Sequence, residues 1–133
     1  MKRAFTDFCL FSFGYSAYSL IELAYRRYTH YSMGIAGGLC FVVLYKIYNK
    51  YKSLSVLKKC LIGSAVITAV EYIFGVIFNL KLKMNVWDYS SLPLNISGQI
   101  CLLYSFLWVI LCLPICYLVP KISRLEKAFD HKI

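Results

Sequence analysis

The sequence predicts an all-α membrane protein with four transmembrane helices. Hydrophobic residues make up 60% of the 133 residues, and the mean hydropathy is +0.64. A water-soluble chain of this length could not bury that much apolar surface, because small domains leave a large share of their surface exposed. A lipid environment removes this difficulty. The whole chain, residues 1–133, is therefore expected to form one integral membrane domain.

Four apolar segments approach the length that a helix needs to cross a bilayer, which is about 20 residues. We expect these polytopic spans at 5–25, 32–48, 60–80 and 96–119. A Lys-rich loop at 49–59 joins the second and third segments, and loops at 26–31 and 81–93 join the others. An even number of crossings would place both termini on the same side of the membrane.

The basic residues are distributed unevenly around these segments. A formal net charge of +9 could suggest nucleic acid, but the Lys and Arg residues flank apolar segments and form no separate domain, so we expect no nucleic-acid partner. Cytoplasmic loops carry an excess of Lys and Arg. Most of the 15 basic residues would share the side of the termini, which predicts a multi-pass cell-membrane protein with both termini cytoplasmic. These residues are Lys2, Arg3, Lys46, Lys50, Lys52, Lys58, Lys59, Lys121, Arg124, Lys127 and Lys132.

Glu71 lies near the middle of the third segment, which is otherwise uncharged. A carboxylate there costs at least about 2–3 kcal/mol on insertion scales, so such residues usually face a bundle interior and are often functional. Two interpretations stay open: a neutral carboxyl group that hydrogen-bonds to a neighbour, or a functional site. Helical spacing places it on one face with Ser64, Thr68, Gly75 and Asn79. For the small residues we favour helix packing; they are Gly34, Gly38, Ser64 and Thr68.

A polar segment precedes the fourth apolar segment. It contains Trp87, Asp88 and Tyr89, and Asn95 is placed to cap the next helix. A helix N-terminus offers free N–H donors and a partial positive charge. Together these groups could form the lip of a pocket at the outer ends of the helices.

Glu22 lies near the outer end of the first segment, and Arg26 follows one turn later. A helix-end ion pair and a ligand-binding pair are both open for these two residues. The two halves of the chain also share a pattern, in which a Glu on one segment is followed by Gly and Cys on the next. This pattern suggests two parallel two-helix repeats, with Glu22, Gly38 and Cys40 matching Glu71, Gly98 and Cys101.

The second half of the chain carries a more specific motif. Its residues are Glu71, Gly75, Trp87-Asp88-Tyr89-Ser90, Pro93, Asn95, Gly98-Gln99-Ile100-Cys101-Leu102 and Trp108. This motif resembles the bacterial family described as putative ABC-transporter type IV, the CmpB-like membrane proteins. The first half is similar at Gly14, Glu22, Gly38 and Cys40 and departs from the family pattern at 31–34 and 41–45. The resemblance covers nearly the whole chain and implies a multi-span membrane protein of the transporter class.

These observations predict a small integral membrane transport protein, or a permease-like subunit, with an intramembrane acidic site that faces a polar cavity. The candidate substrate- or ion-binding residues are Glu71, Glu22, Asp88, Asn95, Trp87, Tyr89 and Arg26. The sequence contains no Gly-x-x-x-x-Gly-Lys-Ser/Thr loop, so any use of ATP would require a partner ATPase subunit. Four spans make a narrow bundle, and we therefore expect a homo-oligomer or a partner subunit within the lipid bilayer.

Two alternatives remain open. One is a membrane-embedded enzyme that uses Glu22, Glu71 and Asp88 as acid–base groups or as oxygen ligands of a metal. The other is a subunit of a membrane complex without transport activity of its own. An enzyme is the less expected class, because both histidines are peripheral, and no cofactor is expected. The six cysteines show no paired spacing and are interpreted as small packing residues.

Overall fold

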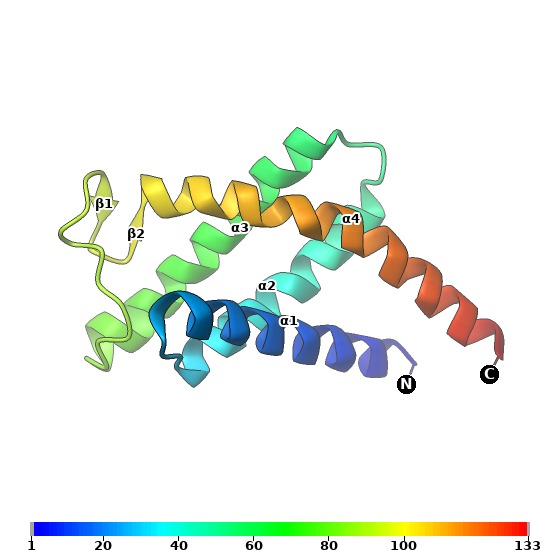
Figure 1. Cartoon of the computed structure of the whole chain (residues 1–133), viewed down its shortest axis with the longest axis horizontal. Coiled ribbons are helices and arrows are strands. Elements are labelled where there is room, and N and C mark those ends of the chain that lie inside the picture. Colours follow the sequence, from blue (N-terminus) through cyan, green and yellow to red (C-terminus); the bar gives the residue numbers. More distant parts are fainter. Residues whose placement is uncertain (1, 133) are drawn as a thin grey trace.

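Four long helices run between two ends of the molecule (Figure 1). The structure, a computed structural model, describes residues 2–132. A π-helical segment continues the third helix, and two short antiparallel strands precede the fourth. The elements are α1 (Lys2–Arg26), α2 (Tyr31–Lys50), α3 (Val56–Gly75), η1 (Val76–Lys81), β1 (Asn95–Ile96), β2 (Ile100–Cys101) and α4 (Leu102–Lys132).

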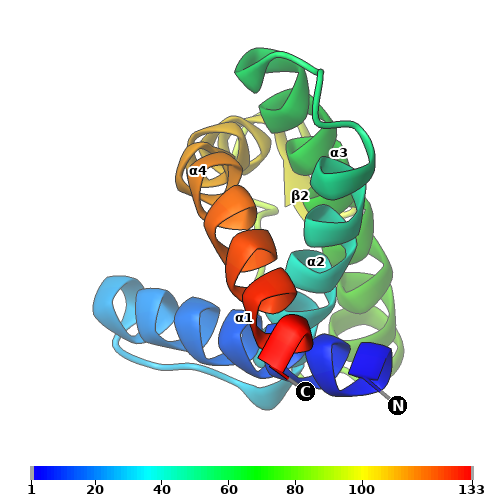
Figure 2. The same ribbon diagram turned by 90° about the vertical axis from the view of Figure 1, so that its right-hand side faces the viewer.

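The two ends of the molecule differ in what they carry. Both chain ends and the short connection between α2 and α3 lie at one end, here called the terminal end (Figure 1). The irregular segment 82–101 lies at the opposite end, here called the loop end (Figure 1). Helix α1 packs mainly against α2, and α3 packs mainly against α4. Figure 2 views these two helix pairs from the terminal end.

Three of the described helices are long and apolar enough to cross a membrane: Tyr31–Lys50, Val56–Lys81 and Leu102–Lys132. The all-α class is therefore confirmed, and the membrane-spanning character is shown for three helices. The first predicted span does form a helix, α1, but this helix is not among the three. Its sequence explains the difference, because Asp7, Glu22 and several Ser and Tyr residues lower its hydropathy.

The predicted start of the fourth span at Ile96 is wrong. Residues 95–101 form the two strands and their turn, and α4 begins only at Leu102. Leu94, Ser97 and Gly98 have φ values of 56°, 56° and 70°, which a right-handed helix does not allow. Asn95 therefore does not cap α4. Its Oδ1 accepts a hydrogen bond from the backbone N–H of Gly98 at 3.0 Å and closes the turn.

The same turn also bears on the proposed repeat. Gly98 and Cys101 lie before α4, whereas their supposed counterparts lie inside α2. The second half of the proposed repeat therefore differs from the first at this point. At its other end, α4 extends past the predicted limit of Val119 to Lys132.

Glycines lie where α1 and α2 cross, as the packing interpretation predicted. A Cβ atom added to Gly38 would lie 2.7 Å from the backbone oxygen of Phe11. A Cβ atom added to Gly34 would lie 2.5 Å from the ring of Tyr15. Real Cβ atoms do not approach other atoms this closely, so the crossing depends on the absence of side chains at both positions.

Polar residues join α3 to α4 in a similar way. The hydroxyl of Ser64 donates to the backbone oxygen of Ser105 at 2.5 Å. The hydroxyls of Thr68 and Ser105 are 2.8 Å apart and form a second hydrogen bond. The predicted packing role of these small residues is confirmed.

Two buried clusters form the interior. The first extends toward the terminal end and contains residues of all four helices: Leu10, Phe41, Leu44, Tyr45, Tyr48, Cys60, Cys112, Cys116 and Val119. The second lies at the loop end and is built largely by segment 82–101: Met33, Val86, Trp87, Tyr89 and Cys101. The five cysteines of the helices α2 to α4 and of β2 are all buried free thiols, in agreement with their predicted packing role.

Candidate functional site

A cavity of about 580 Å³ lies at the loop end, between α1, α4 and segment 82–101. Its volume is in the range of pockets that hold small molecules. Five of the seven predicted site residues line it: Glu22, Arg26, Trp87, Asp88 and Tyr89. We call it the loop-end cavity.

A smaller cavity of about 230 Å³ contains Glu71 in its lining. The two cavities share Tyr18, Trp87 and Trp108 among their lining residues, so they adjoin one another. Apart from Glu71, the lining of the smaller cavity is almost entirely apolar or aromatic. Glu71 thus lines the smaller cavity and not the loop-end cavity, and aromatic and aliphatic side chains border both.

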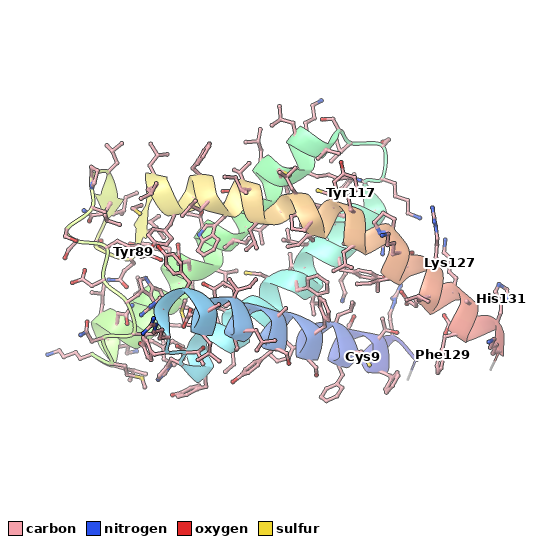
Figure 3. All side chains as sticks on the ribbon, in the orientation of Figure 1. Cys9, Tyr89, Tyr117, Lys127, Phe129 and His131 are labelled. Atoms are coloured by element: carbon pink, nitrogen blue, oxygen red, sulfur yellow. The ribbon has the colours of Figure 1, made fainter. Side chains whose placement is uncertain are left out.

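Glu71 is buried, with 6% of its surface exposed, and each of its carboxylate oxygens accepts one hydrogen bond. The hydroxyl of Tyr89 donates to Oε2 at 3.0 Å, and the indole N–H of Trp108 donates to Oε1 at 3.3 Å. Tyr89 belongs to segment 82–101 and is labelled at the loop end in Figure 3. Through these two hydrogen bonds, Glu71 joins both segment 82–101 and α4 to α3.

Glu22 is more deeply buried, with 3% of its surface exposed, and neither carboxylate oxygen accepts a hydrogen bond of normal geometry among the described residues. The hydroxyl of Thr29, which is buried and also without such a bond, lies near this carboxyl group. The ion pair with Arg26, which was one of the two open interpretations, is not formed within 4 Å. The guanidinium of Arg26 instead donates to the backbone oxygen of Val86 at 2.7 Å and lies 4.9 Å from the ring centre of Tyr28. The guanidinium of Arg26 is thus bound by the backbone carbonyl of Val86 and not by Glu22.

The rest of segment 82–101 is held by local hydrogen bonds. Asp88 is exposed, and its Oδ1 accepts from the backbone N–H of Ser90 at 2.9 Å, which lowers the pKa of Asp88 below its usual value. Trp87 is buried, and its indole N–H donates to the backbone oxygen of Gln99 at 3.0 Å. Asn95 is not among the residues that line the two cavities described above, and its role is to hold the turn.

Gln99 supports the site, although no functional role was predicted for it. Its side chain is buried and accepts a hydrogen bond from Asn79 Nδ2 at 2.8 Å. Asn79 Oδ1 in turn accepts from the backbone N–H of Val86 at 2.6 Å. This chain of bonds positions the carbonyl that binds Arg26. In the sequence, the only indication of this chain of bonds was the position of Asn79 on the same helix face as Glu71.

Aromatic residues of the helices complete the loop-end cavity. Tyr104 stacks on Tyr89 with ring centres 4.5 Å apart, and its hydroxyl lies 3.3 Å from that of Tyr25. Tyr18 packs edge-on against Trp108. Aromatic side chains are common at both faces of a membrane, so their positions in the sequence did not single them out.

The acidic side chains do not gather into one metal site. Within residues 2–132, no group of three or more His, Cys, Asp and Glu side chains is arranged to hold a metal ion. Glu22, Glu71 and Asp88 were predicted as possible joint ligands, and this arrangement does not bring the three together.

Three apolar helices of spanning length define the class of the molecule, which is an α-helical membrane protein. The model of the family described as putative ABC-transporter type IV matches residues 8–133. The chain belongs to this family, which confirms the resemblance seen in the sequence and indicates an ABC-transporter-related membrane protein. A search of curated proteins and a search of solved structures each found no match.

Proposed function

We propose that this protein is a small membrane transport protein or permease-like subunit that binds a cationic or polar solute in the loop-end cavity. The observation that carries the proposal is Glu22, a buried carboxyl group without a hydrogen-bond partner beside that cavity. Burying such a group costs several kcal/mol unless a partner compensates it. A bound cation or a proton would provide the compensation.

The proposed topology has four spans, because α1 also crosses the membrane in addition to the three helices named above. It places both termini in the cytoplasm. The position of both chain ends at the terminal end supports an even number of crossings (Figure 1). The loop between α2 and α3 and the last part of α4 carry many basic residues, as cytoplasmic segments do. With this orientation, the loop-end cavity faces the outside of the cell.

The aromatic lining supports a cationic solute. Tyr25, Tyr89, Tyr104, Trp87 and Trp108 all border the loop-end cavity. The faces of such rings attract cations by about 0.5–2 kcal/mol each, most strongly where water is excluded. A quaternary ammonium ion combines a positive charge with apolar surface and would suit this lining.

Glu71 would couple binding to a second event. It accepts a hydrogen bond from Tyr89, which also lines the loop-end cavity. A proton that binds to Glu71 would weaken this hydrogen bond and free segment 82–101 to move. In this scheme, the solute binds beside Glu22, a proton binds to Glu71, and the two exchange between the adjoining cavities.

The family supports a second version of the proposal, in which the chain is a permease-like subunit driven by a separate ATPase. The sequence itself contains no phosphate-binding loop of the Walker type. A homo-oligomer or a complex with such a subunit would supply the wider pathway that a narrow bundle lacks.

Transport by purified protein in liposomes tests the proposal. Uptake of labelled tetraethylammonium, driven by an imposed pH gradient, is compared for the wild type, Glu22→Gln, Glu71→Gln and Asp130→Asn. We expect the first two variants to lose at least about tenfold in rate, since a charge-assisted contact is worth about 1.5–3 kcal/mol. Asp130 is exposed near the end of α4, away from the cavity, and serves as the matched control.

Two outcomes would count against the carrier. One is equal uptake by the wild type and by Glu22→Gln and Glu71→Gln, which would remove both residues from the mechanism. The other is wild-type uptake no faster than that of empty liposomes. In that case, purification from native membranes with an ATPase attached would favour the subunit version.

A further inference from the structure

A third cavity, of about 340 Å³, lies at the terminal end, far from the loop-end cavity. Four basic side chains line it: Lys52, Lys59, Arg124 and Lys127. None of the residues that line it is acidic. Figure 3 labels Lys127 on the last part of α4. We call this the basic cavity.

The fold brings these four residues together from separate segments. Lys52 belongs to the connection after α2, and Lys59 belongs to the first turn of α3. Arg124 and Lys127 are three residues apart on α4 and so lie on the same helix face. The hydroxyl of Tyr48 donates to the backbone oxygen of Lys59 at 2.6 Å and holds the start of α3 against the end of α2.

The four cations have no carboxylate partner among the described residues. The ion pair between Lys46 and Asp7 lies outside this cavity. Glu126 lies between Arg124 and Lys127 in the sequence, but it accepts a hydrogen bond from the hydroxyl of Tyr45 at 2.5 Å and does not line the cavity. Positive charges that are close together without a counter-ion repel each other, and a bound anion would relieve this repulsion.

The remaining lining residues indicate the type of anion. Cys116, Val119 and Pro120 form an apolar side, and Asn49 and Ser123 add hydrogen-bonding groups. A planar guanidinium and several ammonium groups are typical ligands of phosphate oxygens. Basic pockets between membrane helices on the cytoplasmic side bind lipid phosphates by this chemistry.

We infer that the basic cavity binds a phosphate group, carried either by an anionic phospholipid or by a soluble phosphate compound. This site is independent of the loop-end cavity and of the solute proposed for it. A phosphate here would hold the connection after α2, the start of α3 and the end of α4 together.

Native mass spectrometry of the full-length protein tests the inference. The protein in neutral detergent is mixed with equal amounts of phosphatidylglycerol and phosphatidylcholine, and the bound lipid is counted. We expect the wild type to retain phosphatidylglycerol selectively. The double variant Arg124→Gln/Lys127→Gln should bind it about 30-fold more weakly, because each of the two basic residues contributes a similar share of the affinity for an anionic lipid.

A matched control removes the same charge elsewhere on the same helix. Lys121 and Lys132 are exposed on α4 and do not line the cavity, so Lys121→Gln/Lys132→Gln should retain phosphatidylglycerol as the wild type does. Circular dichroism of both double variants checks that they fold. An equal loss in the two double variants would overturn the inference, because the effect would then be one of net charge alone.

A second arm separates the two sources of phosphate. Inorganic phosphate and pyrophosphate are titrated into lipid-free protein, and binding is followed by calorimetry. Binding of pyrophosphate that is lost in Arg124→Gln/Lys127→Gln supports a soluble ligand. Selective retention of phosphatidylglycerol without pyrophosphate binding supports a lipid. If the protein binds neither anion and does not prefer phosphatidylglycerol to phosphatidylcholine, the inference is wrong.

Discussion

The two ends of this protein satisfy their buried polar groups in different ways. In the cluster toward the terminal end, the hydroxyls of Tyr45 and Tyr48 donate to Glu126 and to the backbone of Lys59. At the loop end, Glu22 is buried with no partner, beside an open cavity. Unpaired buried polar groups are costly, and proteins keep them mainly where function requires them. This difference is the reason why we place the proposed solute site at the loop end.

The largest effect is expected in the cluster toward the terminal end. Leu44 is fully buried there, so Leu44→Ala should lower the free energy of unfolding by about 2–5 kcal/mol, through lost contacts and a residual cavity. Denaturant unfolding in detergent micelles measures the change. Leu57→Ala on the exposed face of α3 is the control and should change it by less than about 0.5 kcal/mol. Equal losses would show that the buried cluster is not the better packed region.

The two buried glutamates should respond in opposite ways to the same substitution. Glu71→Gln replaces one of the two acceptor oxygens by an NH2 group, so that either Tyr89 or Trp108 loses its acceptor. This loss should lower the free energy of unfolding by about 1–3 kcal/mol. Glu22→Gln removes a buried acid that has no partner, and should be neutral or stabilising. The same unfolding measurement applies to both. A loss of stability in Glu22→Gln as large as that in Glu71→Gln would show that Glu22 supports the fold.

The smallest effect is expected at Asp88, at the exposed edge of the loop-end cavity. The N–H of Ser90 lowers the pKa of this carboxyl group in the folded loop. Its contribution is therefore present above the unfolded value of about pH 4 and is lost as the pH falls through the lowered folded value. Fluorescence of Trp87 between pH 7 and pH 3 follows the loop. The difference between the wild type and Asp88→Ala should disappear at low pH.

Asp88→Asn provides the control for this titration. An asparagine oxygen can accept the same hydrogen bond from Ser90 but does not titrate in this range. Its fluorescence should therefore stay independent of pH. A wild-type signal that does not change between pH 7 and pH 3 would contradict the proposed role of the Asp88 carboxylate.

The helical architecture was readable from the sequence because hydropathy and helical spacing are local properties. The packing faces with Gly34, Gly38, Ser64 and Thr68 follow from residue size and period alone, and the structure confirms them. The start of the fourth helix was not readable in this way. Ile96, Ile100 and Cys101 continue the apolar pattern of the fourth helix toward its N-terminus. The side chain of Asn95 and the positive φ of Ser97 and Gly98 nevertheless close a turn there.

Spacing rules also did not predict the hydrogen-bond partners of the acidic residues. An i, i+4 rule paired Glu22 with Arg26, but the carbonyl of Val86 competes for the same cation from a segment 60 positions away. By the same kind of long-range contact, Tyr89 and Trp108 became the donors to Glu71.

The sequence by itself determined a membrane-embedded, all-α protein with an acidic residue inside an apolar helix, and it determined the family. These conclusions depend on composition and on short-range periodicity, which every segment carries within itself. Only the tertiary structure decided that Glu71 is hydrogen-bonded, that Glu22 is unpartnered beside a cavity, and that four basic residues share a second cavity. Hydrogen bonds and cavities depend on groups from distant segments, and a linear sequence does not specify which of these groups meet.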